Sequence, residues 1–133
     1  MKCLDTTFLI DLLNGRKEAI KKSENLDNEL ELFTTEINVF EILYGIFRDK
    51  TIDDEKELQS AKKLFDKLRI LPLKGEATIK SARIAGELTQ KGVTIDSHDC
   101  ITAGVSLANG VSIMVTKNKD HFSRIRGLGI ETY

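Results

Sequence analysis

Three acidic residues, far apart in the sequence, stand at positions where they could do chemistry. Asp5 directly follows the apolar pair Cys3-Leu4, Glu41 lies within an amphipathic segment, and Asp99 opens another. Clustered carboxylates raise one another's pKa unless a cation lies between them. Oxygen ligands of this kind suit Mg²⁺ or Mn²⁺, which polarise a phosphoryl oxygen and activate a bound water. The residue types therefore indicate metal-dependent hydrolysis of a phosphodiester.

Each of these residues also has a purely structural interpretation. Asp5 could cap the helix expected after it, because Asp is a common N-cap. Glu41 could extend to water or pair with a lysine. Asp99 could simply favour the positive end of its helix dipole, with Asp96 as the N-cap.

A fourth cluster of polar residues follows the apolar run Val111–Val115. Thr116, Asn118 and Asp120 lie here, and Asn118 or Asp120 could add an oxygen ligand. Both could instead begin a short helix near residue 121, which is the commoner use of Asn and Asp. His98 and His121 have no carboxylate or serine at a recognisable catalytic spacing, so neither is expected to act as a general base.

Short apolar runs alternate with longer amphipathic segments along the chain. Strands are expected at residues 1–4, 31–34, 70–73 and 111–115. Helices are expected from residue 6 or 7 to 13, and at 17–23, 35–48, 53–68, 76–91 and 96–109. This alternation predicts an α/β sandwich with a mainly parallel sheet, whose active site lies at the carboxyl ends of the strands.

Helical periodicity gives the expected orientation of two helices. In helix 35–48, capped by Thr35, the stripe Ile37, Phe40, Tyr44 and Phe47 is expected to face the core, with Glu41 beside it pointing toward the protein body.

The helix at residues 96–109 has a face of small residues. Asp99, Thr102, Ala103 and Ser106 share this face. Another chain or a ligand could approach it closely.

Composition indicates a soluble globular protein. The chain has 133 residues, 41% of them hydrophobic, and a formal net charge of −1. One domain spanning 1–133 is expected at this length. The apolar runs are too short for a membrane span, and the carboxylate of Asp5 argues against a signal peptide, so we expect a cytoplasmic protein. Cys3 and Cys100 are expected to be reduced and buried.

The near-zero net charge hides an uneven distribution. Residues 1–46 sum to −4, residues 47–91 to +3 and residues 92–133 to zero. A protein that grips nucleic acid only by neutralising phosphates would be more basic. An acidic pocket beside basic flanks is compatible with this pattern.

Four segments, in register, resemble the motifs of PIN-domain ribonucleases, and their order, spacing and total length resemble those of VapC-type toxins. Thr102 departs from the pattern, because many relatives carry an alanine there. The segments are 4–11, 35–45, 99–103, and 115–118 with 121–122 and 126–128.

The resemblance implies a PIN-like three-layer sandwich and a Mg²⁺-dependent endoribonuclease that cleaves single-stranded RNA. It implies Asp5, Glu41 and Asp99 as metal ligands, with Thr6 and Thr116 supporting the site. At a fourth acidic position Asn118 replaces the usual Asp, so either Asn118 or Asp120 would complete the site, with one or two metal ions. The implied partners are a second copy of the chain and a small antitoxin protein that inhibits at the cleft.

The same resemblance implies basic side chains that hold the RNA backbone, and it leaves two other functions open. A PIN-like module could bind RNA or protein without cutting. A phosphoacceptor signalling domain would need a phosphorylatable Asp after a central strand, whereas Asp53-Asp54 lie at a charged helix start. The candidate backbone contacts are Lys62, Lys63, Lys67, Lys117, Lys119, Arg124 and Arg126.

Overall fold

A five-stranded parallel sheet lies at the centre of the molecule. The computed structural model describes all 133 residues. Its strands are β1 (Lys2–Leu4), β2 (Leu32–Thr35), β3 (Arg69–Leu71), β4 (Ile113–Val115) and β5 (Gly129–Glu131). They lie in the order β3-β2-β1-β4-β5, and every neighbouring pair is parallel. The prediction of a mainly parallel sheet is confirmed.

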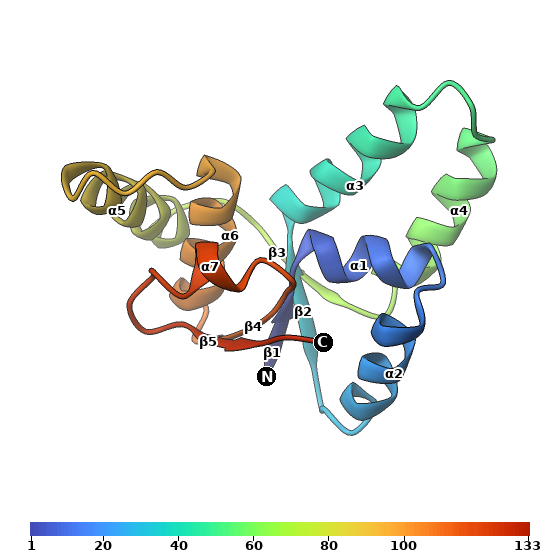
Figure 1. Cartoon of the computed structure of the whole chain (residues 1–133), viewed down its shortest axis with the longest axis horizontal. Coiled ribbons are helices and arrows are strands. Elements are labelled where there is room, and N and C mark those ends of the chain that lie inside the picture. The colour runs from blue at the N-terminus through green and yellow to red at the C-terminus, as the bar shows by residue number, and fades with distance from the viewer.

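Helices cover both faces of this sheet (Figure 1). α1 to α4 lie on one face and α5 to α7 on the other, which confirms the three-layer sandwich. Among the helices, none combines the length and the apolar character needed to cross a bilayer. The helices are α1 (Thr6–Leu13), α2 (Lys17–Leu26), α3 (Glu36–Arg48), α4 (Asp54–Phe65), α5 (Glu76–Gln90), α6 (Ser97–Ala108) and α7 (Lys119–Phe122).

The alternation of side chains along the strands divides the core in two. Cys3 and Met114 belong to the apolar cluster under α5, α6 and α7. Their neighbours Leu4 and Val115 belong to the cluster under α1 to α4. Since successive residues of a strand point to opposite faces, the two central strands anchor both layers at once.

Most predicted elements end within a few residues of the observed ones, as is usual for helix and strand boundaries. The strand predicted at 111–115 is shorter, because only Ile113–Val115 pairs with its neighbours. β5 was not predicted: it has one apolar residue, Ile130, and depends on backbone pairing with β4. Both cysteines are free and buried, as predicted.

The predicted orientation of α3 is wrong. Phe40, Tyr44 and Phe47 are more than half exposed, whereas Asn38 and Ile42 are buried. The helix is apolar on more than one side, so periodicity alone did not show which side meets the sheet. Burial of the polar Asn38, which hydrogen-bonds to three other elements, sets the orientation instead.

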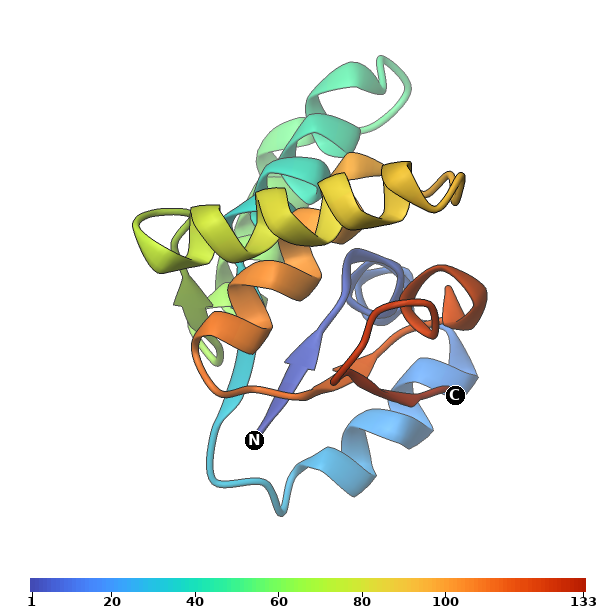
Figure 2. The same ribbon diagram turned by 90° about the vertical axis from the view of Figure 1, so that its left-hand side faces the viewer.

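Helices α5 and α6 cross in close contact (Figure 2). A Cβ atom on Gly104 of α6 would lie 2.2 Å from the Ser81 Oγ and 2.4 Å from the Ser81 Cα of α5. Only glycine permits this approach, which fixes the position of α6 relative to α5.

The small residues of α6 are not free for another chain or a ligand, contrary to expectation. Thr102, Ala103 and Ser106 are fully buried. Ser106 Oγ donates a hydrogen bond to the Val111 carbonyl, and Thr102 Oγ1 accepts one from Asn38. This face packs inside the protein, so its polar groups are satisfied by the chain itself.

Candidate active site

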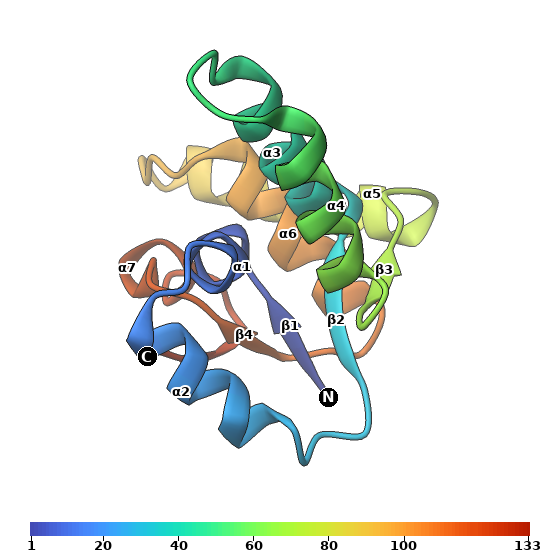
Figure 3. The same cartoon turned by 90° about the vertical axis from the view of Figure 1, so that its right-hand side faces the viewer.

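The carboxyl ends of the central strands bring the candidate residues together. β1 and β2 run side by side into the starts of α1 and α3 (Figure 3). Asp5 follows β1, Thr35 ends β2 and Thr116 follows β4. The site is therefore built where parallel α/β sheets place their ligands.

Asp5 is the most buried of the candidate ligands, with 2% of its surface exposed. Its Oδ2 accepts hydrogen bonds from Thr116 Oγ1 at 2.7 Å and from Thr7 Oγ1 at 3.1 Å. Although Asp5 occupies the N-cap position of α1, its side chain makes no capping bond. The carboxylate is thus held for another purpose than capping.

Burial raises the pKa of Asp5 to about 6, and the charge of Asp99 adds to the rise. The hydrogen bond from Thr116 opposes it. Burial also raises the pKa of Asp99, against the lowering effect of His121. Both carboxylates are therefore in surroundings that a nearby cation would make more favourable.

Asn38 links the strand ends and was missed by the sequence analysis. It forms a capping box with Thr35 at the start of α3. Its Nδ2 donates to Thr6 Oγ1 at 2.9 Å and to Thr102 Oγ1 at 3.2 Å, and lies 3.4 Å from Asp5 Oδ1. The available signal was its place three residues after Thr35, which is the capping-box position.

Glu41 is tied to the same network through Thr6. Thr6 Oγ1 donates to Glu41 Oε1 at 2.9 Å, while it accepts from Asn38. With 29% of its side chain exposed, Glu41 lies at the mouth of the site. It lines a cavity of about 550 Å³ together with Thr6, Phe40, Tyr44 and His98, among others.

Asp99 reaches the site from the first turn of α6. Asp96 is the N-cap, accepting from the His98 backbone N–H at 2.8 Å, so Asp99 is not needed for capping. Its Oδ2 lies 2.8 Å from His121 Nδ1.

The two histidines are not isolated, contrary to the sequence-based interpretation. His121 contacts Asp99, and His98 Nδ1 lies 3.5 Å from Glu41 Oε2. These partners are 22 and 57 residues apart in the sequence, so no local spacing could have revealed them. Glu41 and Asp99 therefore each have a histidine side chain in contact with their carboxylate.

The residues after β4 differ in their relation to the site. Thr116 is buried and bonded to Asp5, and its Oγ1 accepts from the Asn118 backbone N–H at 2.9 Å. Asn118 precedes α7 without a side-chain capping bond. Asp120 is exposed, and its carboxylate forms no hydrogen bond or salt bridge with the rest of the chain.

The donor chemistry of the site suits a hard cation. Asp5, Glu41, Thr6 and Thr116 form one connected set of oxygens, and Asp99 interacts electrostatically with Asp5. No three acidic, His or Cys side chains are close enough to form a complete metal cage on their own. Mg²⁺ does not require one, since it keeps several waters and often binds one or two carboxylates plus substrate phosphate.

This α/β fold, with acidic residues at the carboxyl end of its parallel sheet, defines a PIN domain: the family model for the PIN domain matches residues 2–128, and the chain belongs to that family. It is similar to Ribonuclease VapC1 of Rickettsia felis, with 29% identity over 133 residues, covering 97% of this chain and 93% of the relative. Ribonuclease VapC1 of Methanocaldococcus jannaschii is also 29% identical, covering 98% of this chain and 85% of the relative.

Solved structures give the same fold. A DNA-bound VapBC from Salmonella typhimurium superposes with a TM-score of 0.86 at 29% identity, covering 98% of this chain and 96% of the other. VapBC2 from Rickettsia felis, bound to a promoter DNA fragment, has a TM-score of 0.88 at 23% identity, covering 99% and 98%. At that lower identity the likeness concerns the fold alone.

Proposed function

We propose that this protein is a Mg²⁺-dependent endoribonuclease that hydrolyses phosphodiester bonds of single-stranded RNA in the cytoplasm, as the toxin of a VapBC-type pair. The observation that carries the proposal is the buried Asp5 carboxylate. It is held by Thr116 at the carboxyl end of the central strand and linked through Asn38 and Thr6 to Glu41. The ribonuclease names of the relatives support the same reaction.

One or two of the carboxylates of Asp5, Glu41 and Asp99, together with waters, would hold the metal ion, which when bound would polarise the scissile phosphate and lower the pKa of a water. Thr116 orients the Asp5 carboxylate, and Thr6 orients that of Glu41. Because both hydroxyls are themselves hydrogen-bonded by groups of the fold, the carboxylate oxygens are positioned before substrate arrives. We expect Asn118, whose backbone N–H donates to Thr116 Oγ1, to add a further oxygen in preference to the exposed Asp120.

A cleavage assay tests this proposal. A labelled single-stranded RNA is incubated with the protein in Mg²⁺ and in EDTA, and the variants Asp5→Asn and Asp99→Asn are compared with Asp96→Asn. Asp96 provides a matched control, because it lies on the same helix and asparagine is an equally good N-cap. We expect EDTA and the first two substitutions to reduce cleavage by orders of magnitude, and Asp96→Asn to leave it within a few-fold.

The same assay separates the other functions considered. A PIN-like binding module would retain RNA affinity without any Mg²⁺-dependent cleavage. A phosphoacceptor domain would incorporate phosphate from a small phosphodonor. Asp53 is a poor candidate for that role, because its side chain caps α4 by accepting from the Lys56 N–H.

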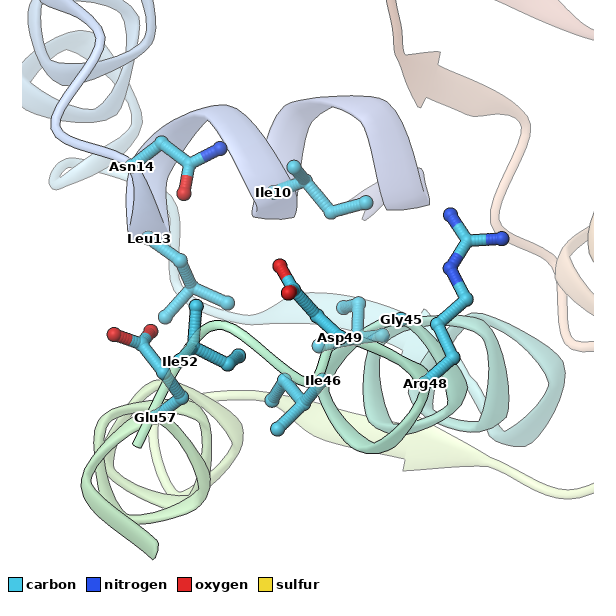
Figure 4. A pocket seen from close by; sticks show the side chains of 10 residues that line it. Ile10, Leu13, Asn14, Gly45, Ile46, Arg48, Asp49, Ile52 and Glu57 are labelled. Atoms are coloured by element: carbon cyan, nitrogen blue, oxygen red, sulfur yellow. The ribbon is translucent and has the colours of Figure 1, made fainter. Parts of the chain in front are cut away.

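An antitoxin is proposed to occupy the groove between α1, α3 and α4 (Figure 4). This groove has a volume of about 310 Å³, and its apolar side chains include Ile10, Leu13, Ile46 and Ile52. An apolar segment of a small partner protein would cover these side chains. The similarity to the DNA-bound VapBC complex from Salmonella typhimurium supports such a partner. A Leu13→Asp variant should lose the antitoxin in a co-purification experiment while retaining nuclease activity.

A homodimer is proposed through the exposed face of α3. Phe40 and Tyr44 stack there with ring centroids 6.1 Å apart, and Phe47 is equally exposed. Contiguous aromatic surface of this kind is typical of a protein interface. Since Glu41 lies beside Phe40, pairing through this face would bring two acidic clefts together. Light scattering should give twice the chain mass for the wild type and a single mass for Phe47→Asp.

A further inference from the structure

A groove of about 710 Å³ lies between α5 and the segment that follows α7. Its lining has five cationic side chains and a single carboxylate, that of Glu87, which gives a formal charge of +4. This is an unusual concentration for a chain whose net charge is −1. The cationic side chains are Lys80, Arg83, Lys91, Arg124 and Arg126.

None of these five cations is neutralised by the protein. The salt bridges of the chain use other basic groups, such as Lys2, Lys22, Arg69 and Lys117. All five groove cations are exposed at the surface. Like charges held along one groove repel each other, and an anionic ligand would relieve that repulsion.

The groove has a fixed shape because its floor belongs to the core. Ile84, Leu88 and Ile125 line it and are each less than a tenth exposed. On α5, Lys80 lies three residues before Arg83 and four before Ile84, so Lys80 stands on the same side of the helix as both. A firm apolar floor with a cationic rim suits a chain of nucleotides better than a single small anion.

Both walls of the groove continue into elements that carry the candidate site. α5 ends at Gln90, and a short loop that begins with Lys91 leads to the start of α6, where Asp99 lies. Arg124 and Arg126 follow α7, whose His121 contacts Asp99. An acidic cleft repels a polyanion, so the affinity for RNA must come from cations beside the cleft.

We propose that this groove binds the phosphodiester backbone of single-stranded RNA and holds it beside the acidic site, which deepens the function proposed above and rests on it. Three of the cations are arginines, whose planar guanidinium groups bind phosphate through two hydrogen bonds and stack on bases. Binding is largely independent of sequence, because the contacts are to phosphate.

The test measures RNA binding apart from cleavage. Asp5→Asn protein and the same protein carrying Arg83→Gln, Arg124→Gln and Arg126→Gln are titrated into a fluorescein-labelled 12-nucleotide RNA, and anisotropy is followed at several salt concentrations. Each phosphate contact on a single strand contributes about 0.7 to the slope of log Kd against log salt. The three substitutions should lower this slope by about 2 and weaken binding between tenfold and a hundredfold near 0.1 M salt.

A matched control removes the same charge from another face. Lys17→Gln, Lys21→Gln and Lys56→Gln change exposed cations on α2 and α4, none of which is a candidate RNA contact. This variant should bind RNA within about threefold of its parent. In cleavage by the chain that retains Asp5, the groove variant should show a raised KM with kcat largely kept, because the groove holds RNA away from the reacting bond.

Other outcomes would overturn the groove as an RNA site. They are equal RNA affinity in the groove variant and its parent, equal losses in the groove and control variants, or no RNA binding by either parent. Arginine-dependent binding of polyglutamate that exceeds binding of RNA would show that the groove takes an acidic protein. A changed mass by light scattering would show an interface between copies. If the protein still cleaves RNA when the groove does not bind it, the proposed nuclease activity stands and only the groove proposal is refuted. If the groove binds RNA but the protein does not cleave it, only the nuclease proposal is refuted.

Discussion

Replacing Asp5 by asparagine should stabilise the folded chain at neutral and alkaline pH. Burial raises the pKa of this carboxyl from 3.8 to about 6. A difference of this size corresponds to about 3 kcal/mol of unfolding free energy. Because the folded chain holds the proton more tightly than the unfolded chain, the ionised carboxylate destabilises the fold above pH 6. This destabilisation fades as the pH falls through 6 toward 3.8.

Asparagine keeps part of the hydrogen bonding. Its carbonyl oxygen can accept from Thr116 in place of Asp5 Oδ2, at the 2.7 Å contact. Its amide group would then face Asn38 Nδ2, which lies 3.4 Å from Asp5 Oδ1, and two donors in contact cost about 1 kcal/mol. The net gain is about 2 kcal/mol at pH 8, or a rise in melting temperature of about 6 to 8 °C for a domain of this size.

Urea denaturation followed by circular dichroism at pH 8, 6 and 4, in EDTA, measures this difference. The gap between Asp5→Asn and the wild type should close between pH 8 and pH 4. Asp120→Asn is the control, because this carboxylate is exposed and forms no hydrogen bond or salt bridge within the chain. A gap of the same size at all three pH values, or a less stable Asp5→Asn protein at pH 8, would refute the reasoning.

Three further outcomes are expected. Millimolar Mg²⁺ at pH 8 should raise the melting temperature of the wild type but not of Asp5→Asn, as scanning calorimetry would show, because a ligand stabilises only the protein that binds it. Gly104→Ala should lower the free energy of unfolding, measured in urea, by about 3 kcal/mol or more, since its Cβ would overlap Ser81. Gly86→Ala is the control: nothing lies within 4 Å of its Cβ, so this variant should raise the free energy of unfolding by about 0.5 to 1 kcal/mol. Asn38→Ala should destabilise by about 2 to 3 kcal/mol and slow RNA cleavage, because several buried groups lose their partner.

The positions of Asp5 and Thr116 could be predicted from the sequence, because both directly follow apolar strand segments. In a parallel sheet that placement alone brings them to the same edge. The alternation of strands and helices likewise predicted the layers. These inferences succeed because each depends on a local pattern and one general rule of topology.

The contacts of Asn38 and His121 could not be predicted in the same way. Asn38 bonds to Thr102, 64 residues away, and His121 to Asp99, 22 residues away. Such pairs depend on how helices dock, which local periodicity does not specify. The outward orientation of the aromatic side chains of α3 could not be predicted for the same reason, because the contacts of Asn38 decide which side of this helix faces the sheet.

The position of β1 in the sheet has a consequence for how the protein is made. This strand is synthesised before the other four but pairs with β4, and Asp5 meets Thr116 across 111 residues. Such distant pairing delays folding until β4 has been synthesised. A nascent chain that has not yet extended past Val115 lacks the hydroxyl that holds Asp5, so an unfinished polypeptide has an incomplete site. The candidate site would therefore be complete only after β4 and Thr116 have been synthesised.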